Sequence, residues 1–146
     1  MFILSISALR EIAEDYRRQR DDDQTNNDLT KKLTIVPNGT TDTAVKWVKT
    51  KWKDVTVGSI LKIESGKQFP ADLVLLASSE PNGMAYIETS NLDGETNLKL
   101  KQALPITAEF TSDDEIKQIR GDCEAEAPTK HLYEFYGNFK VTKPSS

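Results

Sequence analysis

From residue 31 onward, short runs rich in β-branched and aromatic residues alternate with turn-forming residues. The runs fall at residues 33–36, 44–52, 55–63, 72–78 and 85–89. The turn formers that punctuate them are Pro37-Asn38-Gly39, Gly58, Ser65-Gly66, Pro70 and Pro81-Asn82-Gly83. Each of these residues supplies a fixed or positive φ where a chain reverses direction. The pattern therefore predicts antiparallel β structure that closes as a sandwich or a barrel.

Two further elements are predicted near the end of the chain. Ser112 and Glu115 have the spacing of a capping box, which predicts a short surface helix over residues 112–120. Residues 132–141 then alternate with a period of two, from Tyr133 to Val141, and form the clearest strand pattern in the sequence.

The N-terminal part has a different pattern, which indicates a helix. Its apolar positions are Leu9, Ile12, Ala13 and Tyr16. This spacing builds one apolar helix face and predicts an amphipathic helix over residues 5–19. Residues 21–28 are polar and mostly acidic or amide-bearing, so we expect a solvated loop or linker there.

Length, charge and residue inventory exclude several classes of protein. The 146 residues fit one domain. A net charge of -4 gives no general attraction to nucleic acid. Cys123 is the only cysteine, which favours a reducing compartment, and His131 is the only histidine, which excludes a two-histidine metal site. The sequence also has no glycine-rich phosphate loop ending in Lys-Ser or Lys-Thr, so the chain does not read as a complete ATPase.

The remaining chemistry lies in residues 86–99, where Gly94 stands between Asp93 and Glu95 and is followed by Thr96. Without further context, Asp93-Gly94 reads as a hairpin turn. Asp93 and Glu95 could also form a glycosidase pair, because positions i and i+2 of a strand lie roughly 6–7 Å apart. However, no aromatic or polar residues crowd the motif to hold a sugar.

In its context, this segment resembles the actuator motif of the type IV P-type ATPases, the phospholipid flippases. Asp93-Gly94-Glu95-Thr96 stands between Glu88-Thr89-Ser90-Asn91-Leu92 and Asn97-Leu98-Lys99, as in that family. The resemblance extends over residues 5–141. Further landmarks are Glu14-Asp15-Tyr16-Arg17-Arg18, Asn26-Asn27, Val57-Gly58, Pro70-Ala71-Asp72, Ser78-Ser79-Glu80-Pro81 and the segment from His131 to Asn138. Ser59 departs from the family pattern, which has an acidic residue there, and we expect only a local effect on a turn.

The resemblance implies a fold and a mechanism. The fold would be mainly β, a distorted jelly-roll or double-sheet β-sandwich with the N-terminal amphipathic helix and the short surface helix. Glu95 would orient and partly deprotonate the water that hydrolyses an aspartyl phosphate. Gly94 would let the backbone approach that site closely. Asp93 and Thr96 would fix the loop through hydrogen bonds from side chain to backbone, and Thr96 could also touch the phosphoryl oxygens.

The resemblance also implies a parent protein, a P-type phospholipid-transporting ATPase that acts as a translocase. ATP and Mg²⁺ would be bound by its phosphorylation and nucleotide-binding domains, which would be the partners of this chain. Aminophospholipid would bind to the membrane spans, and a glycosylated accessory subunit is commonly present. The chain would lie at the cytosolic face of this multi-pass protein, in an endomembrane or the plasma membrane. Alone it is expected to be inactive and to bind no cofactor or metal.

The expected division is a helix and linker from the second membrane span over residues 1–30 and the actuator β-domain over residues 31–146. Pro144-Ser145-Ser146 end the chain where the family has one more strand, so we expect that strand to be missing. The alternative function is a non-catalytic β-sandwich interaction module, in which Asp93-Gly94 is only a turn. An exposed Glu95 would favour the actuator, and a carboxylate buried against its own domain would favour the module.

Overall fold

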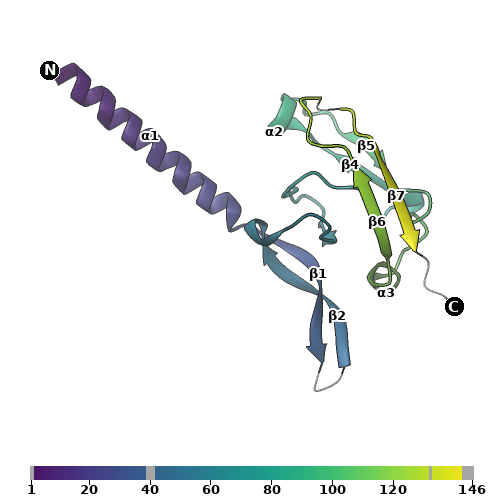
Figure 1. Ribbon diagram of the computed structural model, residues 1–146. Coiled ribbons are helices and arrows are strands. Elements are labelled where there is room, and N and C mark those ends of the chain that lie inside the picture. Colours follow the sequence, from purple (N-terminus) through teal and green to yellow (C-terminus); the bar gives the residue numbers. More distant parts are fainter. Residues whose placement is uncertain (1, 39–41, 132, 143–146) are drawn as a thin grey trace. The chain divides into compact units, whose positions relative to one another are not determined.

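The computed structural model describes residues 2–38, 42–131 and 133–142. The chain divides into two compact units, Met1–Ala71 and Asp72–Ser146 (Figure 1). The first unit holds a three-stranded sheet, and the second holds two sheets of two strands each. The predicted boundary near residue 30, between a linker and a β-domain, stays a prediction.

The first unit begins with the long helix α1, Phe2–Asn26. The helix predicted over residues 5–19 is confirmed, whereas the loop predicted from residue 21 is wrong as far as Asn26. Arg17 stands four residues before Asp21, a spacing that places opposite charges on one helix face and supports a solvated helix without an apolar stripe. Asn27 ends the helix, because its side-chain Nδ2 donates to the Asp23 carbonyl at 2.7 Å.

A three-stranded antiparallel sheet follows, in the order β2-β1-β3. Its strands are β1, Leu29–Asn38, β2, Asp42–Lys51, and β3, Leu61–Lys62. The register places Leu33 opposite Trp47, an apolar cross-strand pair of the kind that stabilises sheets. The strands predicted at residues 33–36 and 44–52 are therefore confirmed. The Gly39 part of the expected turn lies outside the described residues.

The strand predicted over residues 55–63 is wrong except at β3. A short 3-10 helix, Trp52–Asp54, and a turn precede it. In this turn, the Ser59 N–H donates to the Thr56 carbonyl at 3.0 Å, and Gly58 has a φ of 84°. The third position of this turn has a positive φ, which glycine adopts readily and which a strand residue does not have. The Ser59 hydroxyl accepts a further hydrogen bond from the Thr56 N–H at 3.1 Å, within the same turn. The expected local effect of Ser59 stays a prediction.

The second unit contains a first hairpin-like sheet made by β4, Met84–Ile87, and β5, Lys99–Gln102. The strand predicted at residues 85–89 is confirmed. The strand predicted at 72–78 is wrong, because this segment makes single bonds and no ladder. Leu104 donates its N–H to the Leu75 carbonyl, and the Thr107 hydroxyl donates to the Leu76 carbonyl. Thr107 is fully buried at 0% exposure, and Ala103 and Ile119 are also buried.

The second sheet of this unit pairs β6, Arg120–Ala125, with β7, Gly137–Thr142. The predicted strand over residues 132–141 is confirmed only in its second half, and Leu132 lies outside the described residues. The ladder runs from Arg120 opposite Thr142 to Ala125 opposite Gly137, and just beyond it the Glu126 N–H donates to the Tyr136 carbonyl at 3.1 Å.

The short surface helix is confirmed as α3, Asp113–Lys117. Its capping box is formed in full: the Ser112 hydroxyl accepts from the Glu115 N–H, and the Glu115 carboxylate accepts from the Ser112 N–H. Among the helices that the structure describes, none combines the length and apolarity that crossing a bilayer requires.

The antiparallel character of the sheets is confirmed, but the closed arrangement is not. The described strands form three separate small sheets, and no sandwich or barrel closes among them. The chain is thus a mixture of helix and strand rather than a mainly β structure. Two features reduce the β content below expectation: the length of α1 and the irregular backbone of residues 55–60 and 72–78.

Candidate functional site

The candidate site is the connection between β4 and β5. After β4, the chain forms one helical turn, α2, Ser90–Asp93. Gly94 ends this turn with a φ of 74°, and its N–H donates to the Ser90 carbonyl at 2.9 Å. Asp93-Gly94 is therefore the C-terminus of a helical turn and not a hairpin turn. A left-handed residue after a helix is usually glycine, because a Cβ is disfavoured in that conformation.

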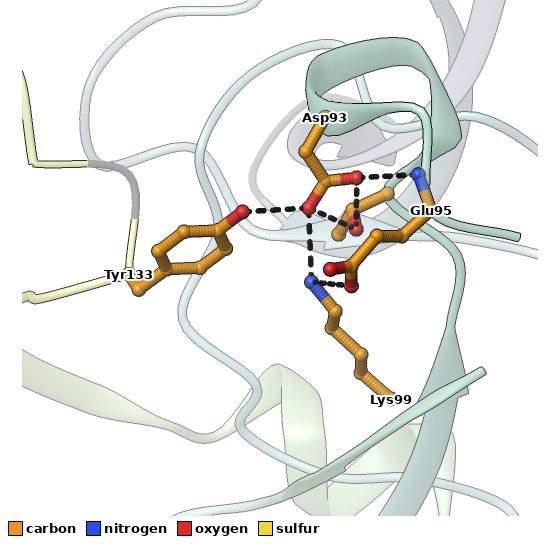
Figure 2. A network of polar contacts seen from close by, with 5 residues as sticks. Asp93, Glu95, Lys99 and Tyr133 are labelled. Carbon is orange, nitrogen blue, oxygen red and sulfur yellow. Dashed lines mark hydrogen bonds and ion pairs between the residues drawn. The ribbon is translucent and has the colours of Figure 1, made fainter. Parts of the chain in front are cut away.

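The Asp93 carboxylate is the centre of the site (Figure 2). Its Oδ1 accepts from the Glu95 N–H at 2.9 Å, and its Oδ2 accepts from Lys99 Nζ at 3.0 Å and from the Tyr133 hydroxyl at 2.8 Å. The Thr89 hydroxyl lies 3.0 Å from both carboxylate oxygens. Only 10% of the Asp93 side chain is exposed. Both oxygens are thus occupied by donors of the same chain.

These donors shift the pKa values of the groups around Asp93. The Glu95 N–H, followed by Lys99 and Tyr133, holds the pKa of the Asp93 carboxyl well below its usual range. The hydrogen bonds to Asp93 and then to Glu95 raise the pKa of Lys99. The hydrogen bond to Asp93, with burial as a second cause, raises the pKa of Tyr133. Asp93 is therefore an ionised anchor, since a proton acceptor in catalysis needs a pKa nearer the working pH.

The backbone of Glu95 is fixed by a hydrogen bond, and its side chain is accessible to solvent. Its N–H is bound to Asp93, whereas 57% of its side chain is exposed. One carboxylate oxygen, Oε2, lies 3.0 Å from Lys99 Nζ. Figure 2 shows the carboxylates of Asp93 and Glu95 converging on this one ammonium group. The arrangement does not match a glycosidase pair, because the two residues do not lie on a strand and both bind the same lysine.

The other motif residues, Gly94 and Thr96, are exposed. No heavy atom lies within 4 Å of the position that a Gly94 Cβ would take, apart from the adjacent residues. The expected hydrogen bond from side chain to backbone is present for Asp93. Among the residues that the structure describes, none makes a hydrogen bond with the Thr96 side chain. Its predicted part in fixing the loop is therefore not observed.

Three contributors were not predicted as site residues: Thr89, Lys99 and Tyr133. Thr89 and Lys99 are spaced four residues from Asp93 and Glu95 respectively, and this spacing could have indicated their contacts. Tyr133 lies 40 residues from Asp93, and no local pattern connects them. A strand through Tyr133, as predicted, would have fixed the face of the sheet on which its hydroxyl lies. The strand is not formed at Tyr133.

The site has little capacity to hold a metal. In the described ranges, no group of three or more His, Cys, Asp and Glu side chains could hold a metal ion. Asp93 is surrounded by hydrogen-bond donors, and Lys99 occupies the space between the two carboxylates. A cation would have to displace this ammonium group. His131 lies outside any strand, and its N–H donates to the Thr129 hydroxyl at 3.2 Å.

The Asp93 network is expected to be insensitive to pH between about 5 and 9. Asp93 has a lowered pKa, so its contribution is complete above the ordinary value of about 4 and is lost as the pH falls through the folded value. Lys99 and Tyr133 have raised pKa values, so their contributions are complete below about 10 and are lost as the pH rises through the folded values. Protection of the Glu95 amide in hydrogen exchange, corrected for the intrinsic rate, measures this. Loss of protection near neutral pH would contradict it.

Comparison with known proteins identifies the class of protein to which the chain belongs. No protein-family model matches it. It is 48% identical over 141 residues to phospholipid-transporting ATPase tat-1 of Caenorhabditis elegans, a match that covers 97% of this chain and 12% of that protein. It is 39% identical over 141 residues to phospholipid-transporting ATPase DRS2 of Saccharomyces cerevisiae, covering 97% and 10%. Human phospholipid-transporting ATPase ID is 37% identical over 137 residues, covering 94% and 11%.

These matches define the chain as homologous to a segment of P-type ATPases. The relatives within that class are phospholipid-transporting ATPases, so the chain is homologous to a segment of this family, which confirms the resemblance seen in the sequence. The chain spans 10–12% of the length of these relatives.

Proposed function

We propose that this chain is the actuator domain of an ATP-driven phospholipid flippase, in which the loop from Asp93 to Thr96 promotes hydrolysis of an aspartyl phosphate and couples it to lipid movement. The observation that carries the proposal is the presentation of Glu95. Its backbone is tied to Asp93 by a hydrogen bond of 2.9 Å, while 57% of its side chain is exposed. A carboxylate that must act on another domain has to be both fixed and accessible. Its exposure also supports the actuator over a non-catalytic interaction module.

In this function, Glu95 accepts a hydrogen bond from the attacking water and draws off its proton as the water meets phosphorus. Positioning of this kind requires the carboxylate within hydrogen-bond reach of the water and the water in line with the leaving oxygen. Thr96 is exposed and can donate its hydroxyl to a phosphoryl oxygen. Asp93 takes no part in proton transfer in this account. Its role is to hold the loop through the contacts with Glu95 and Lys99.

The remaining parts of the proposal concern the parent protein. ATP and Mg²⁺ would be bound by its phosphorylation and nucleotide-binding domains, where magnesium neutralises charge on the phosphoryl group. The described residues of this chain offer no metal cluster of their own. Membrane spans would bind the aminophospholipid, a glycosylated accessory subunit would accompany them, and this chain would lie on the cytosolic side of an endomembrane or the plasma membrane. In the parent, we expect the small sheets to pack as the jelly-roll sandwich of an actuator domain.

Replacing Gly94 with alanine tests whether the loop must approach another surface. Gly94 and Gly58 both have positive φ, 74° and 84°, and at neither does a Cβ meet any atom within 4 Å. Both alanine variants should therefore lose about 1 kcal/mol through backbone strain alone. Only Gly94→Ala should also slow decay of the phosphoenzyme in the full-length transporter, by about tenfold, because its methyl group would enter the docked interface. Equal decay rates for the two variants would count against a close approach at Gly94.

A further inference from the structure

The ammonium group of Lys99 lies between the two carboxylates of the loop. Its Nζ is 3.0 Å from Asp93 Oδ2 and 3.0 Å from Glu95 Oε2. The same group lies 4.8 Å from the centre of the Tyr133 ring, within the range of a cation–π interaction. Figure 2 shows Lys99 reaching both carboxylates, with Tyr133 beside the same Asp93 oxygen. Besides Glu95, Lys99 is thus held by two other groups, the Asp93 carboxylate and the Tyr133 ring.

Lys99 lies in a strand, whereas Glu95 lies in the connection that precedes it. Lys99 is the first residue of β5 and pairs with Ile87 of β4. Its side chain is 27% exposed, against 57% for Glu95. The cation is therefore positioned by the sheet and by Asp93, and the more exposed partner of the ion pair is the Glu95 carboxylate. This order matters because an ion pair costs least entropy when one member is already fixed.

Building on the proposed function, we propose that Lys99 is a positioning residue for Glu95: its ammonium group orients the Glu95 carboxylate and offsets the repulsion that this carboxylate meets on approaching a phosphoryl group. Two anionic groups a few ångströms apart repel each other strongly once water is excluded. A cation within hydrogen-bond distance of Glu95 lowers this barrier without help from the partner domain. The loop thus carries part of its own charge neutralisation.

If Lys99 had a purely structural role, replacing it would disturb the fold. Asp93 keeps three donors without Lys99, namely the Glu95 N–H, the Thr89 hydroxyl and the Tyr133 hydroxyl. The pair between Lys99 and Glu95, whose side chain is 57% exposed, also contributes little to folding. We therefore expect loss of the lysine charge to change the rate of phosphoenzyme decay and to leave the fold intact.

The test measures phosphoenzyme decay after an ATP chase in the full-length transporter. Lys99→Met and Lys99→Gln should form phosphoenzyme to the normal level, which shows that they are folded, and should slow its decay by about tenfold. Lys99→Arg should restore decay to within about threefold of the unmodified protein, since its guanidinium group can bridge both carboxylates. The matched control is Lys101→Met, on the same strand, which should decay normally. Normal decay in both neutral Lys99 variants would overturn the inference.

A second measurement asks whether Lys99 acts through Glu95. In a Glu95→Gln background, Lys99→Met should cause no further slowing, because the carboxylate that it positions is gone. A full additional slowing would assign Lys99 a separate role and overturn the inference. If Glu95→Gln traps the phosphoenzyme but Lys99→Met does not slow its decay, only the inference about Lys99 fails. If Glu95→Gln decays normally, the proposed function fails, and the inference fails with it.

Discussion

Glu95→Gln in the full-length transporter is expected to leave formation of the phosphoenzyme intact and to slow its hydrolysis by at least about a hundredfold. Glutamine keeps the length of the side chain and one oxygen, but it cannot take a proton from water. It also loses the ion pair with Lys99, which is 3.0 Å long in the structure. Labelling with radioactive ATP, followed by a chase with unlabelled ATP, measures both steps in one experiment.

The matched control for this change is Glu88→Gln, because Glu88 precedes the same loop and is exposed, while the donors to Asp93 are Thr89, Glu95, Lys99 and Tyr133. This variant should hydrolyse the phosphoenzyme at the normal rate. A Glu95→Gln variant with the same decay rate as Glu88→Gln would remove Glu95 from the mechanism.

Asp93→Asn is expected to release the loop from its anchor and to slow phosphoenzyme decay by at least about tenfold. The asparagine amide has the size of the carboxylate but carries no charge. Its NH2 group is a donor at a position where a carboxylate oxygen accepted hydrogen bonds. The ion pair with Lys99 at 3.0 Å and one of the acceptors for Thr89 or Tyr133 would therefore be lost. Hydrogen exchange should show lower protection of the Glu95 amide, whose bond of 2.9 Å depends on this side chain.

Asp114→Asn provides the comparison for this second change. The Asp114 side chain is 84% exposed, and its ion pair with Lys117 at 2.8 Å lies within α3. Its loss should affect neither the Glu95 amide nor the decay rate. Unchanged protection of the Glu95 amide in Asp93→Asn would show that the loop is held by contacts other than those of Asp93.

Local sequence signals predicted those parts of the fold in which neighbouring residues decide the conformation. The capping box of Ser112 and Glu115 forms as expected, and the positive φ of Gly58 confirms a predicted turn. The misses have physical causes. The polar segment from residue 21 continues α1 without an apolar stripe that could have predicted it. β6 is exposed along its length, so its sequence shows no alternation of apolar and polar residues. β-propensity at residues 72–78 was not enough without a partner strand.

The sequence predicted the loop motif of the candidate site but not the residues that hold the loop in place. The run from Asp93 to Thr96 was identified from its context, and the left-handed conformation of Gly94 agrees with the choice of glycine. The network that holds it depends on tertiary structure. Tyr133 reaches Asp93 across 40 residues, and Lys99 enters from a strand whose polar sequence, Lys-Leu-Lys-Gln, gave little sign of pairing. Sequence patterns do not record which distant donors a buried carboxylate will find.

The most direct test of the central claim is a structure of the full-length transporter trapped with a metal fluoride that mimics the phosphoryl group on its aspartate. The account predicts the Glu95 carboxylate within about 3 Å of the water in line with the mimic, with Lys99 still beside it. A Glu95 carboxylate that points away from the mimic, too far for one water molecule to bridge the two, would contradict the account.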